Sequence, residues 1–267
     1  MRRFSFFSLL LILTLFFVQA EAADFEHREN SIRFRGMADA SVALEAGLGS
    51  ITANPAGLAG QKNRELYLTY QDLFGLGLYY HNFAFALPAR GGAFGLAYER
   101  LENNVDLEYK VSSLQLAYGL ATTKLPLSYG VSVKASKLDS LGGTAELLSL
   151  GAGVLGKTGD FSWGISAFNI ASWAEPAGKV ESAPLEVKLG LAYAKNNGMI
   201  AIEMNNEQEL RLGAEYKLSE ALALRCGLKD GAPAFGLGLH HGLWNFDYSF
   251  DLGSLGNTHA LGFTKQF

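Results

Sequence analysis

The sequence predicts an all-β fold, a closed antiparallel β-barrel that spans a membrane with about fourteen strands. Three observations support this prediction. Short segments with alternating apolar and polar residues fill the chain from residue 65 to residue 267. Aromatic residues recur near the ends of these segments, as they do in the two girdles of a membrane barrel. The connections between the segments alternate between tight turns and longer loops.

The composition agrees with a sheet that has one wet face and one apolar face. Charged residues make up 18% of the 267 residues, aromatics make up 12%, and there are 31 glycines against 6 prolines. The formal net charge of -4 gives no broad basic field, which argues against nucleic acid as a partner. Cys226 is the only cysteine, so an intramolecular disulfide is impossible, and we interpret it as a small apolar strand residue.

The N-terminus reads as an export signal. Arg2 and Arg3 precede an apolar run over residues 4–18, and Ala20 and Ala22 provide the small residues of a cleavage site. We therefore predict a cleaved signal peptide at residues 1–22 and delivery to the outer membrane of a Gram-negative-type cell. A membrane anchor helix is the alternative, but the run is short and ends at the cleavage pattern. No later stretch has the roughly 18 apolar residues that a transmembrane helix needs.

The segment at residues 244–252 shows the strand period most clearly. Trp244, Phe246 and Tyr248 share one face, while Asn245 and Asp247 share the other. A water-soluble β-sandwich produces the same alternation. The aromatic strand ends, and a polar face rich in Gly, Ser and Ala, favour a membrane barrel instead. Fourteen such segments begin near Glu65, Leu76, Gly92, Val111, Leu127, Glu146, Phe161, Leu185, Gly198, Glu209, Leu222, Ala234, Leu243 and Thr258.

The connections predict how the barrel is oriented. Tight turns are expected at residues 88–91, 157–160, 195–198 and 240–242, and longer loops are expected at residues 101–110, 138–144 and 171–183. Bacterial barrels place their short turns on the periplasmic side and their longer loops outside. The last strand, at residues 259–267, ends on an aromatic residue, although Lys265 interrupts its apolar face. A lysine near the membrane interface costs little, against about 2–4 kcal/mol at the midplane.

Residues 23–64 differ from the rest of the mature chain. They contain Gly-Met-Ala-Asp-Ala-Ser-Val-Ala at 36–43 and Asn-Pro-Ala-Gly-Leu-Ala at 54–59, which are too broken for a membrane helix and too rich in Gly and Ala for a strand. This pair of motifs resembles the N-terminal hatch of the long-chain fatty acid transporter (FadL, OMPP1/TodX) family, and is similar to the related PorV and PorQ outer-membrane proteins. The candidate hatch residues are Gly36, Asn54, Pro55, Ala56, Gly57 and Leu58.

The resemblance implies a fourteen-stranded barrel whose hatch, a short helix and a turn, folds into the lumen, blocks the pore and shifts to pass a hydrophobic ligand. Small residues such as Gly36 and Ala40 let a short helix pack closely inside a barrel. Asn54 before Pro55 favours a turn, because proline biases its predecessor away from the helical region. A hatch that moves and a rigid plug both fit these residues. We therefore expect a gated channel for small hydrophobic compounds, with a PorV-like component of protein secretion or an interaction scaffold as the alternative.

Charged residues on the polar face of the strands are candidates for the lumen. They either tune solute selectivity or, as we favour, pair across adjacent strands and hold the hatch to the wall. These lumen charges are Arg211, Glu215, Arg225, Asp247 and Asp251, with Lys229 beside them. Glycines in the early strands allow a kink and a lateral gap, or serve only packing. These glycines are Gly75, Gly77, Gly91, Gly92 and Gly95.

We expect no enzyme activity, no metal and no cofactor. His240, His241 and His259 fall in no recognisable nucleophile motif and have no metal-ligand spacing. Glu203, with Glu207 and Glu209, reads as a solvated loop, with a calcium site as the alternative. The expected partners are outer-membrane lipid, a hydrophobic small molecule and, under the alternative, secretion-machinery proteins. We expect a monomer.

Overall fold

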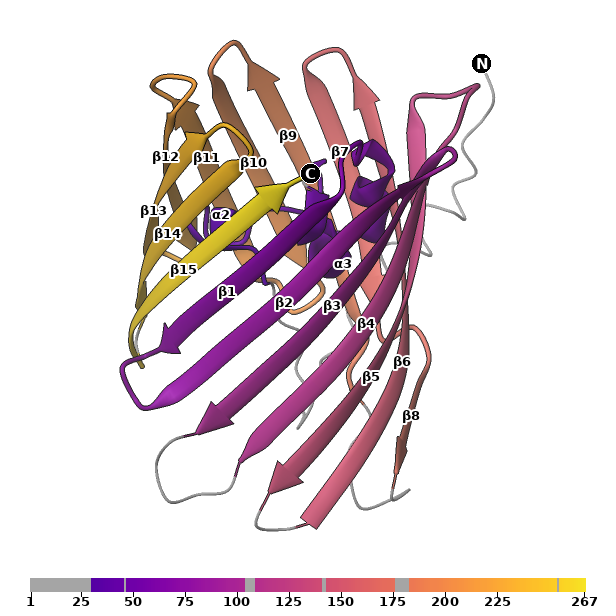
Figure 1. Ribbon diagram of the computed structural model, residues 1–267, viewed down its shortest axis with the longest axis vertical. Coiled ribbons are helices and arrows are strands. Elements are labelled where there is room, and N and C mark those ends of the chain that lie inside the picture. Colours follow the sequence, from indigo (N-terminus) through magenta and orange to yellow (C-terminus); the bar gives the residue numbers. More distant parts are fainter. Residues whose placement is uncertain (1–29, 46, 104–108, 141–142, 176–182, 254) are drawn as a thin grey trace.

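The computed structural model describes residues 30–45, 47–103, 109–140, 143–175, 183–253 and 255–267. The predicted signal peptide and the first residues of the predicted hatch lie outside these ranges. The described strands form a closed antiparallel barrel in which fourteen strands make up the wall and a fifteenth, short strand is added to one of them (Figure 1). The predicted fold class is confirmed.

The strands run in sequence order around the barrel, and β1 closes it by pairing with β15. Their bounds are β1 Glu65–Leu73, β2 Leu78–Ala89, β3 Gly92–Asn103, β4 Lys110–Ala121, β5 Leu127–Ser140, β6 Gly143–Thr158, β7 Phe161–Phe168, β8 Ser172–Glu175, β9 Glu186–Lys195, β10 Gly198–Asn205, β11 Leu210–Lys217, β12 Leu222–Lys229, β13 Ala232–His241, β14 Trp244–Gly253 and β15 Gly256–Gln266.

Each strand turns one face to the lumen and the other to the membrane, because successive side chains of a strand point to opposite sides. In β1, Tyr67, Thr69 and Gln71 are buried, whereas Leu68 and Tyr70 are about two-fifths exposed. Buried strand residues are mostly small or polar, and the exposed ones are mostly large and apolar. The predicted separation into a wet face and an apolar face is present.

One predicted loop is absent. Residues 138–144 were expected as a longer loop, but β5 and β6 continue through this region, with Asp139 opposite Thr144 and Ser140 opposite Gly143. The alternation of the two strands persists here, since Leu138 and Ala145 are buried. The predicted loop was wrong for the described residues of this range, because strand β5 continues to Ser140 and strand β6 begins at Gly143.

The extra strand β8 is the outer continuation of β7. Asn169 has a positive φ of 56°, which breaks the regular strand geometry after Phe168. The chain then returns to the edge of β6, where Ile170 N donates to Leu150 O and Leu150 N donates to Ala171 O, both at 3.0 Å. Strand β8 pairs with β6 and with no other strand in the described part of the chain. The predicted count of fourteen wall strands therefore holds.

The wall is uneven in height. Strands β2 to β6 have 12 to 16 residues, whereas β10, β11 and β12 have 8 each. In Figure 1 the long strands extend downward past the short ones. The predicted tight turns all lie at the opposite end, which we take as the periplasmic side.

Aromatic rings lie close together near the tight-turn end of the outer surface. Phe94 and Tyr118 have ring centroids 4.5 Å apart, and Phe161 and Tyr193 have centroids 4.6 Å apart. Lys265, which interrupted the apolar face of the last strand, has its Nζ 4.5 Å from the centroid of the Trp244 ring. A cation above an aromatic face is attracted by the ring's quadrupole, so this lysine is accommodated at the membrane interface.

The hatch fills the barrel interior with short helical turns: α2 Ile32–Arg35, η1 Gly47–Gly49, α3 Ser50–Ala53 and η2 Pro55–Gly60. Figure 1 shows it, in indigo, enclosed by the strands. Its apolar side chains, among them Ile32, Phe34 and Ile51, are fully buried and pack on lumen-facing alanines of the wall. Among the described residues, no helix is both long enough and apolar enough to cross a membrane.

The early strands show no lateral gap within the described residues. The ladder between β2 and β3 is unbroken from Leu78 opposite Asn103 to Ala89 opposite Gly92. Gly95, one of the predicted kink glycines, faces the hatch, and a Cβ there would lie 2.7 Å from Ile51 Cγ1. The contact at Gly95 therefore favours the interpretation that these glycines serve packing, and not a kink with a lateral gap.

Candidate functional site

The wall meets the hatch at glycines, which bring the two backbones into contact. A Cβ at Gly164 would overlap the carbonyl of Val42, and a Cβ at Gly130 would overlap the backbone between Pro55 and Ala56. At nine wall glycines a Cβ would lie less than 3.0 Å from a hatch atom, of the backbone or of a side chain, and we call these the glycine seat: Gly95, Gly119, Gly130, Gly153, Gly164, Gly190, Gly213, Gly227 and Gly236. They come from nine different wall strands. At these nine positions the wall therefore contributes no side chain to its contact with the hatch.

Asn54 joins two parts of the hatch to the wall. Its Nδ2 donates to Val42 O at 2.8 Å and to Val154 O of β6 at 3.1 Å. Its Oδ1 accepts from Ala56 N at 3.1 Å, which caps the start of η2. Asn54 itself is fully buried with an extended backbone, as expected for a residue before proline. One side chain thus satisfies three backbone groups.

The other predicted hatch residues are also placed against their neighbours. Gly36 packs on Gly236, and a Cβ on Gly36 would lie 2.8 Å from Gly236 Cα. A Cβ on Gly57 would overlap Ser50 Oγ. Pro55, Ala56 and Leu58 are buried against the seat. The six predicted residues therefore lie at tight contacts within the hatch or with the wall.

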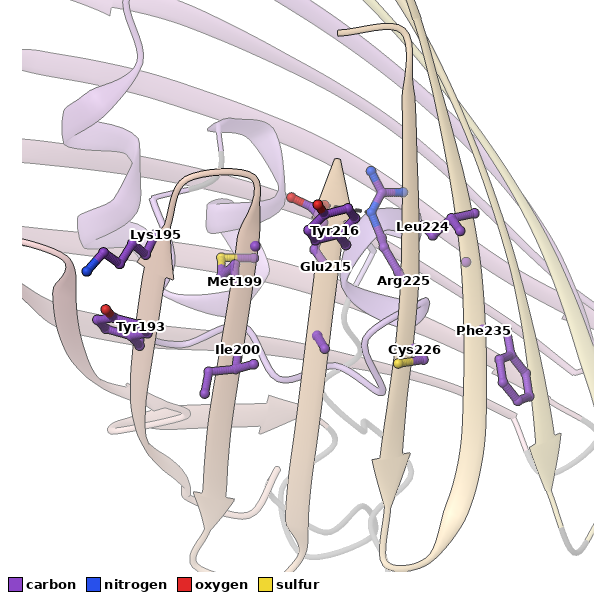
Figure 2. Close-up of a pocket in the computed structure, with 13 residues that line it drawn as sticks. Tyr193, Lys195, Met199, Ile200, Glu215, Tyr216, Leu224, Arg225, Cys226 and Phe235 are labelled. Atoms are coloured by element: carbon purple, nitrogen blue, oxygen red, sulfur yellow. Dashed lines mark hydrogen bonds and ion pairs between the residues drawn. The ribbon is translucent and has the colours of Figure 1, made fainter. Parts of the chain in front are cut away.

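Buried ion pairs hold the start of the hatch to the short side of the wall. Arg33 donates to both oxygens of Glu215, from Nε at 2.8 Å and from Nη2 at 2.9 Å. Arg225 donates to Glu215 at 2.7 Å and to Asp247 at 2.6 Å. Figure 2 shows Glu215 and Arg225 on neighbouring strands, joined by a dashed line. Burial by itself lowers the pKa of the Arg33 guanidinium, but Glu215 and Asp247 outweigh it and raise that pKa.

Two further groups of charges also bind the hatch. Arg35 donates to Asp251 at 2.9 Å from its Nε. Glu203 accepts from the backbone N–H groups of Ser41 and Val42, both at 2.8 Å, and pairs with Arg211 at 2.9 Å. All five predicted lumen charges therefore form ion pairs, directly with the hatch or with a group that contacts it.

Sequence reasoning missed three of these partners. Arg33 and Arg35 were not singled out, and Glu203 was interpreted as part of a solvated loop. Glu203 lies in β10 and is only 1% exposed, so that interpretation was wrong. Glu203 and Ala201 are two residues apart on the same strand and therefore face the same side, the lumen. This alternation was the sequence signal that could have identified Glu203 as a lumen residue. Within the described residues, no group of three His, Cys, Asp or Glu side chains is arranged to hold a metal ion.

A layer of buried polar side chains lies on the tall wall, on the loop side of the hatch. We call it the polar belt: Thr69, Gln71, Asn82, Glu99, Ser113, Gln115 and Ser136. Its members are neighbours across strands, since Thr69 is opposite Asn82 and Asn82 is opposite Glu99. Two of them also hold the hatch: Asn82 Oδ1 accepts from Asn30 at 3.2 Å, and Gln115 Nε2 donates to Ile51 O at 2.9 Å.

Beyond the polar belt, toward the long loops, the lumen face becomes apolar. Two buried groups meet there and share the partly buried Tyr109 and Val111. Together they form what we call the outer cluster: Leu73, Phe74, Leu78, Tyr80, Leu101, Tyr109, Val111, Leu138, Ala145, Leu147, Ala174 and Ala183. The lumen is therefore layered, with an apolar mouth, a polar belt and then the hatch.

On the tight-turn side of the hatch lies a polar cavity of about 290 Å³. Arg33, Glu65, Glu215, His240 and Asp247 are among the residues that line it. An apolar solute gains nothing by leaving water for such surroundings.

The outer surface also has a hollow, of about 790 Å³, on the short side of the wall (Figure 2). Ala214 and the exposed Cys226 are opposite each other at its centre, and larger side chains such as Ile200, Tyr216 and Phe235 surround them. These large side chains face away from the lumen, whereas Glu215 and Arg225, which also line the hollow, belong to the lumen face.

Solved structures with a similar fold include hydrocarbon channels and transporters. The Ralstonia pickettii toluene transporter TbuX aligns with a TM-score of 0.66 at 12% identity, over 91% of this chain and 100% of that one. The deltaS2 mutant of the TodX monoaromatic hydrocarbon channel aligns with a TM-score of 0.68 at 12% identity, over the same shares. The P. putida toluene transporter TodX gives 0.60 at 12% identity, over 88% and 97%.

These alignments confirm the fold that the FadL-family resemblance implied, a barrel like that of the TodX and TbuX channels. At 12% identity they concern the fold alone. No protein-family model matches the chain, and no curated protein sequence matches it.

Proposed function

We propose that this protein is an outer-membrane channel for small hydrophobic compounds, with the hatch as its gate. The outer cluster is the observation that carries this proposal. A barrel that passes polar solutes has a polar interior, whereas here the mouth of the lumen is lined by buried apolar side chains. Burying apolar surface is worth about 25 cal/mol per Å², so this mouth favours hydrophobic molecules over water.

The order of the layers along the lumen favours an exit of the transported molecule through the barrel wall into the bilayer. A hydrophobic molecule that continued straight through the lumen would meet the polar belt, the sealed hatch and the polar cavity in turn. Release into the bilayer avoids these polar surroundings. Strand β8 supports an exit near the outer cluster, because among the described strands it pairs with β6 alone and Ala174 of the cluster lies on it. Transport of toluene and of monoaromatic hydrocarbons by the structural neighbours supports the same class of compound.

A reversible disulfide between hatch and wall tests the gate. The Cβ of Ala43 lies 3.7 Å from the Cβ position of Gly190, which is within the range of disulfide geometry. The variant carries Ala43→Cys and Gly190→Cys, with Cys226→Ser to remove the native thiol. Val42→Ala removes the nearest contact, since Val42 Cγ1 is 2.5 Å from that Cβ position, and the remaining contact with Ile202 O, at 2.9 Å, requires a small shift of the strand.

Uptake of toluene into vesicles is the measurement. The oxidised protein should take up toluene about tenfold more slowly than the same protein after reduction, because the hatch cannot leave its seat. Each single-cysteine variant should respond to neither treatment. Equal uptake in the oxidised and reduced states would exclude gating by the hatch. Uptake no faster than through empty vesicles in both states would exclude the channel itself.

The alternative is a PorV-like role in secretion or as a structural outer-membrane component. The tight seating of the hatch is the observation that favours it, because a plug held by buried ion pairs and glycine contacts also suits a permanent seal. Crosslinking in intact cells separates the two roles: secretion proteins and a lumen that stays closed would support the alternative. Neither role involves catalysis.

Two proposals concern the chain before the barrel. We propose that residues 1–22 are removed on export and that residues 23–64 act as one hatch unit. N-terminal sequencing of the protein purified from outer membranes should begin near Ala23, and an intact residue 1 would exclude cleavage.

A further inference from the structure

Five members of the polar belt use only part of their hydrogen-bonding capacity. Within the described part of the chain, Asn82 bonds to the hatch through Oδ1 but its Nδ2 has no partner, and Gln115 bonds through Nε2 but its Oε1 has none. Glu99 pairs with Lys134 through Oε2, at 2.8 Å, and leaves Oε1 without a partner. Thr69 Oγ1 and Gln71 Nε2 likewise find no partner among the described residues. All five side chains are at least nine-tenths buried.

Unpaired polar atoms in this number are unusual, because each buried donor or acceptor without a partner costs free energy. The five side chains come from four adjacent strands, β1 to β4, and face the same part of the lumen. They lie between the hatch and the outer cluster, whose Leu73, Tyr80 and Leu101 are the next lumen-facing residues on β1, β2 and β3. A hydrophobic molecule in the outer cluster would therefore have its inner end at the belt.

The unpaired atoms of the polar belt determine which chemical group the inner end of the bound molecule can carry. Gln71 and Asn82 offer N–H donors, and Glu99 and Gln115 offer acceptors. A hydroxyl can accept one hydrogen bond and donate another, so it can bond to both the donors and the acceptors of the belt. This remains true if the side-chain amide of Asn82 or Gln115 rotates by half a turn and exchanges its oxygen and nitrogen. A carboxylate only accepts, and it would lie next to the free oxygen of Glu99, which repels it.

We propose that the polar belt binds the neutral hydroxyl group of an otherwise hydrophobic molecule, an alcohol or a phenol, whose apolar part lies in the outer cluster. This inference rests on the proposed channel function and narrows its substrate class. Binding displaces side chains of the outer cluster, because the unpaired atoms are fully buried in this structure.

The test compares two probes that differ by one group: 4-methylphenol and p-xylene. Binding to the full-length protein in lipid nanodiscs is measured by equilibrium dialysis, with empty nanodiscs to subtract partition into lipid. The wild type should bind 4-methylphenol about tenfold more tightly than p-xylene, because only the phenol satisfies the belt. A third probe, 4-methylbenzoate, should bind more weakly than 4-methylphenol.

Substitutions show whether the polar belt itself recognises the hydroxyl or whether binding changes for general structural reasons. Gln71→Leu and the nearly isosteric Thr69→Val should each reduce the preference for the phenol, and both remain informative if only one of them folds. Ser128→Ala is the matched control, since Ser128 is a buried serine on the lumen face of β5 that lies outside the polar belt. Ser128→Ala should keep the wild-type preference.

Three results would overturn the inference. Equal binding of 4-methylphenol and p-xylene, or an unchanged preference in both folded belt variants, would show that the belt does not recognise the hydroxyl. An experimental structure with 4-methylphenol present that shows only water at the belt would do the same. Failure of the channel function looks different, because then p-xylene itself is neither bound nor taken up.

Discussion

At the residue scale, Asn54 is the side chain on which the order of the hatch most depends. It bonds to the carbonyls of Val42 and Val154 and to the amide of Ala56, and its own side chain is fully buried. Leucine of similar size would fill the volume but satisfy none of the three backbone groups. The motif residue is thus explained by backbone hydrogen bonds between segments that are distant in the sequence.

Asn54→Ala should lower the free energy of opening of the hatch by about 1–3 kcal/mol, because it leaves buried backbone groups unpaired. Hydrogen exchange at residues 40–58 measures this opening. Asn63→Ala is the matched control, since the Asn63 side chain bonds to Gln266 at 3.4 Å in an exposed position. Equal exchange in both variants would contradict the role of Asn54.

Glu215→Ala should cost about 3–5 kcal/mol at the start of the hatch, because it takes one carboxylate from the buried Arg225 and leaves Arg33 without its partner. Exchange at residues 31–40 reports the effect. Glu45→Ala, in the hatch itself, removes only an exposed partner of Lys157 at 3.5 Å and should cost no more than about 1 kcal/mol. If the two substitutions had the same effect, the buried ion pairs would not be what holds the hatch.

At the scale of elements, the fit between the hatch and the barrel depends on the glycine seat. A seat glycine contributes close approach, since a Cβ at Gly164 or Gly130 would occupy the space of the hatch backbone. The strands themselves accept alanine at these positions, because neither glycine has a positive φ. Substitution should therefore leave the barrel folded but unseat the hatch.

Gly164→Ala should raise the ion conductance of the barrel in planar bilayers severalfold. Gly198→Ala is the control, because the nearest atom to its Cβ position, Tyr216 Cδ2, is 3.6 Å away. If the Gly164→Ala protein is folded and its conductance is as low as that of the wild type, the hatch tolerates a side chain at this position without opening the lumen.

The sequence predicts the strands well and the contacts between them poorly. The alternation at residues 244–252 is local, and it predicted β14 with its two faces. Arg33, Arg35 and Glu203 were missed because their partners lie far along the chain, and which strand faces which part of the hatch depends on the register of the whole barrel. The belt was missed for the same reason: Thr69, Asn82 and Glu99 are adjacent only after the strands pair.

At the scale of the whole molecule, the orientation of the faces can be tested at the single native thiol. Cys226 is exposed on the outer face of β12, where lipid should surround it. A spin label on Cys226 should be accessible to dissolved oxygen but shielded from a water-soluble nickel complex. The label on a Glu220→Cys, Cys226→Ser variant, at an exposed tight turn, should show the opposite pattern. The reverse result would place the apolar face inside.

The uneven wall has a consequence for the membrane around the protein. A strand tilted by about 45° needs 9–11 residues to cross a bilayer, and β10, β11 and β12 have 8. The bilayer must therefore thin beside these strands, or the barrel must lean toward them, at a cost of fractions of a kcal/mol per Å of mismatch. Two barrels that met along their short sides would share one thinned region instead of making two. The elasticity of the surrounding lipid thus gives this chain a preferred side for approaching its neighbours.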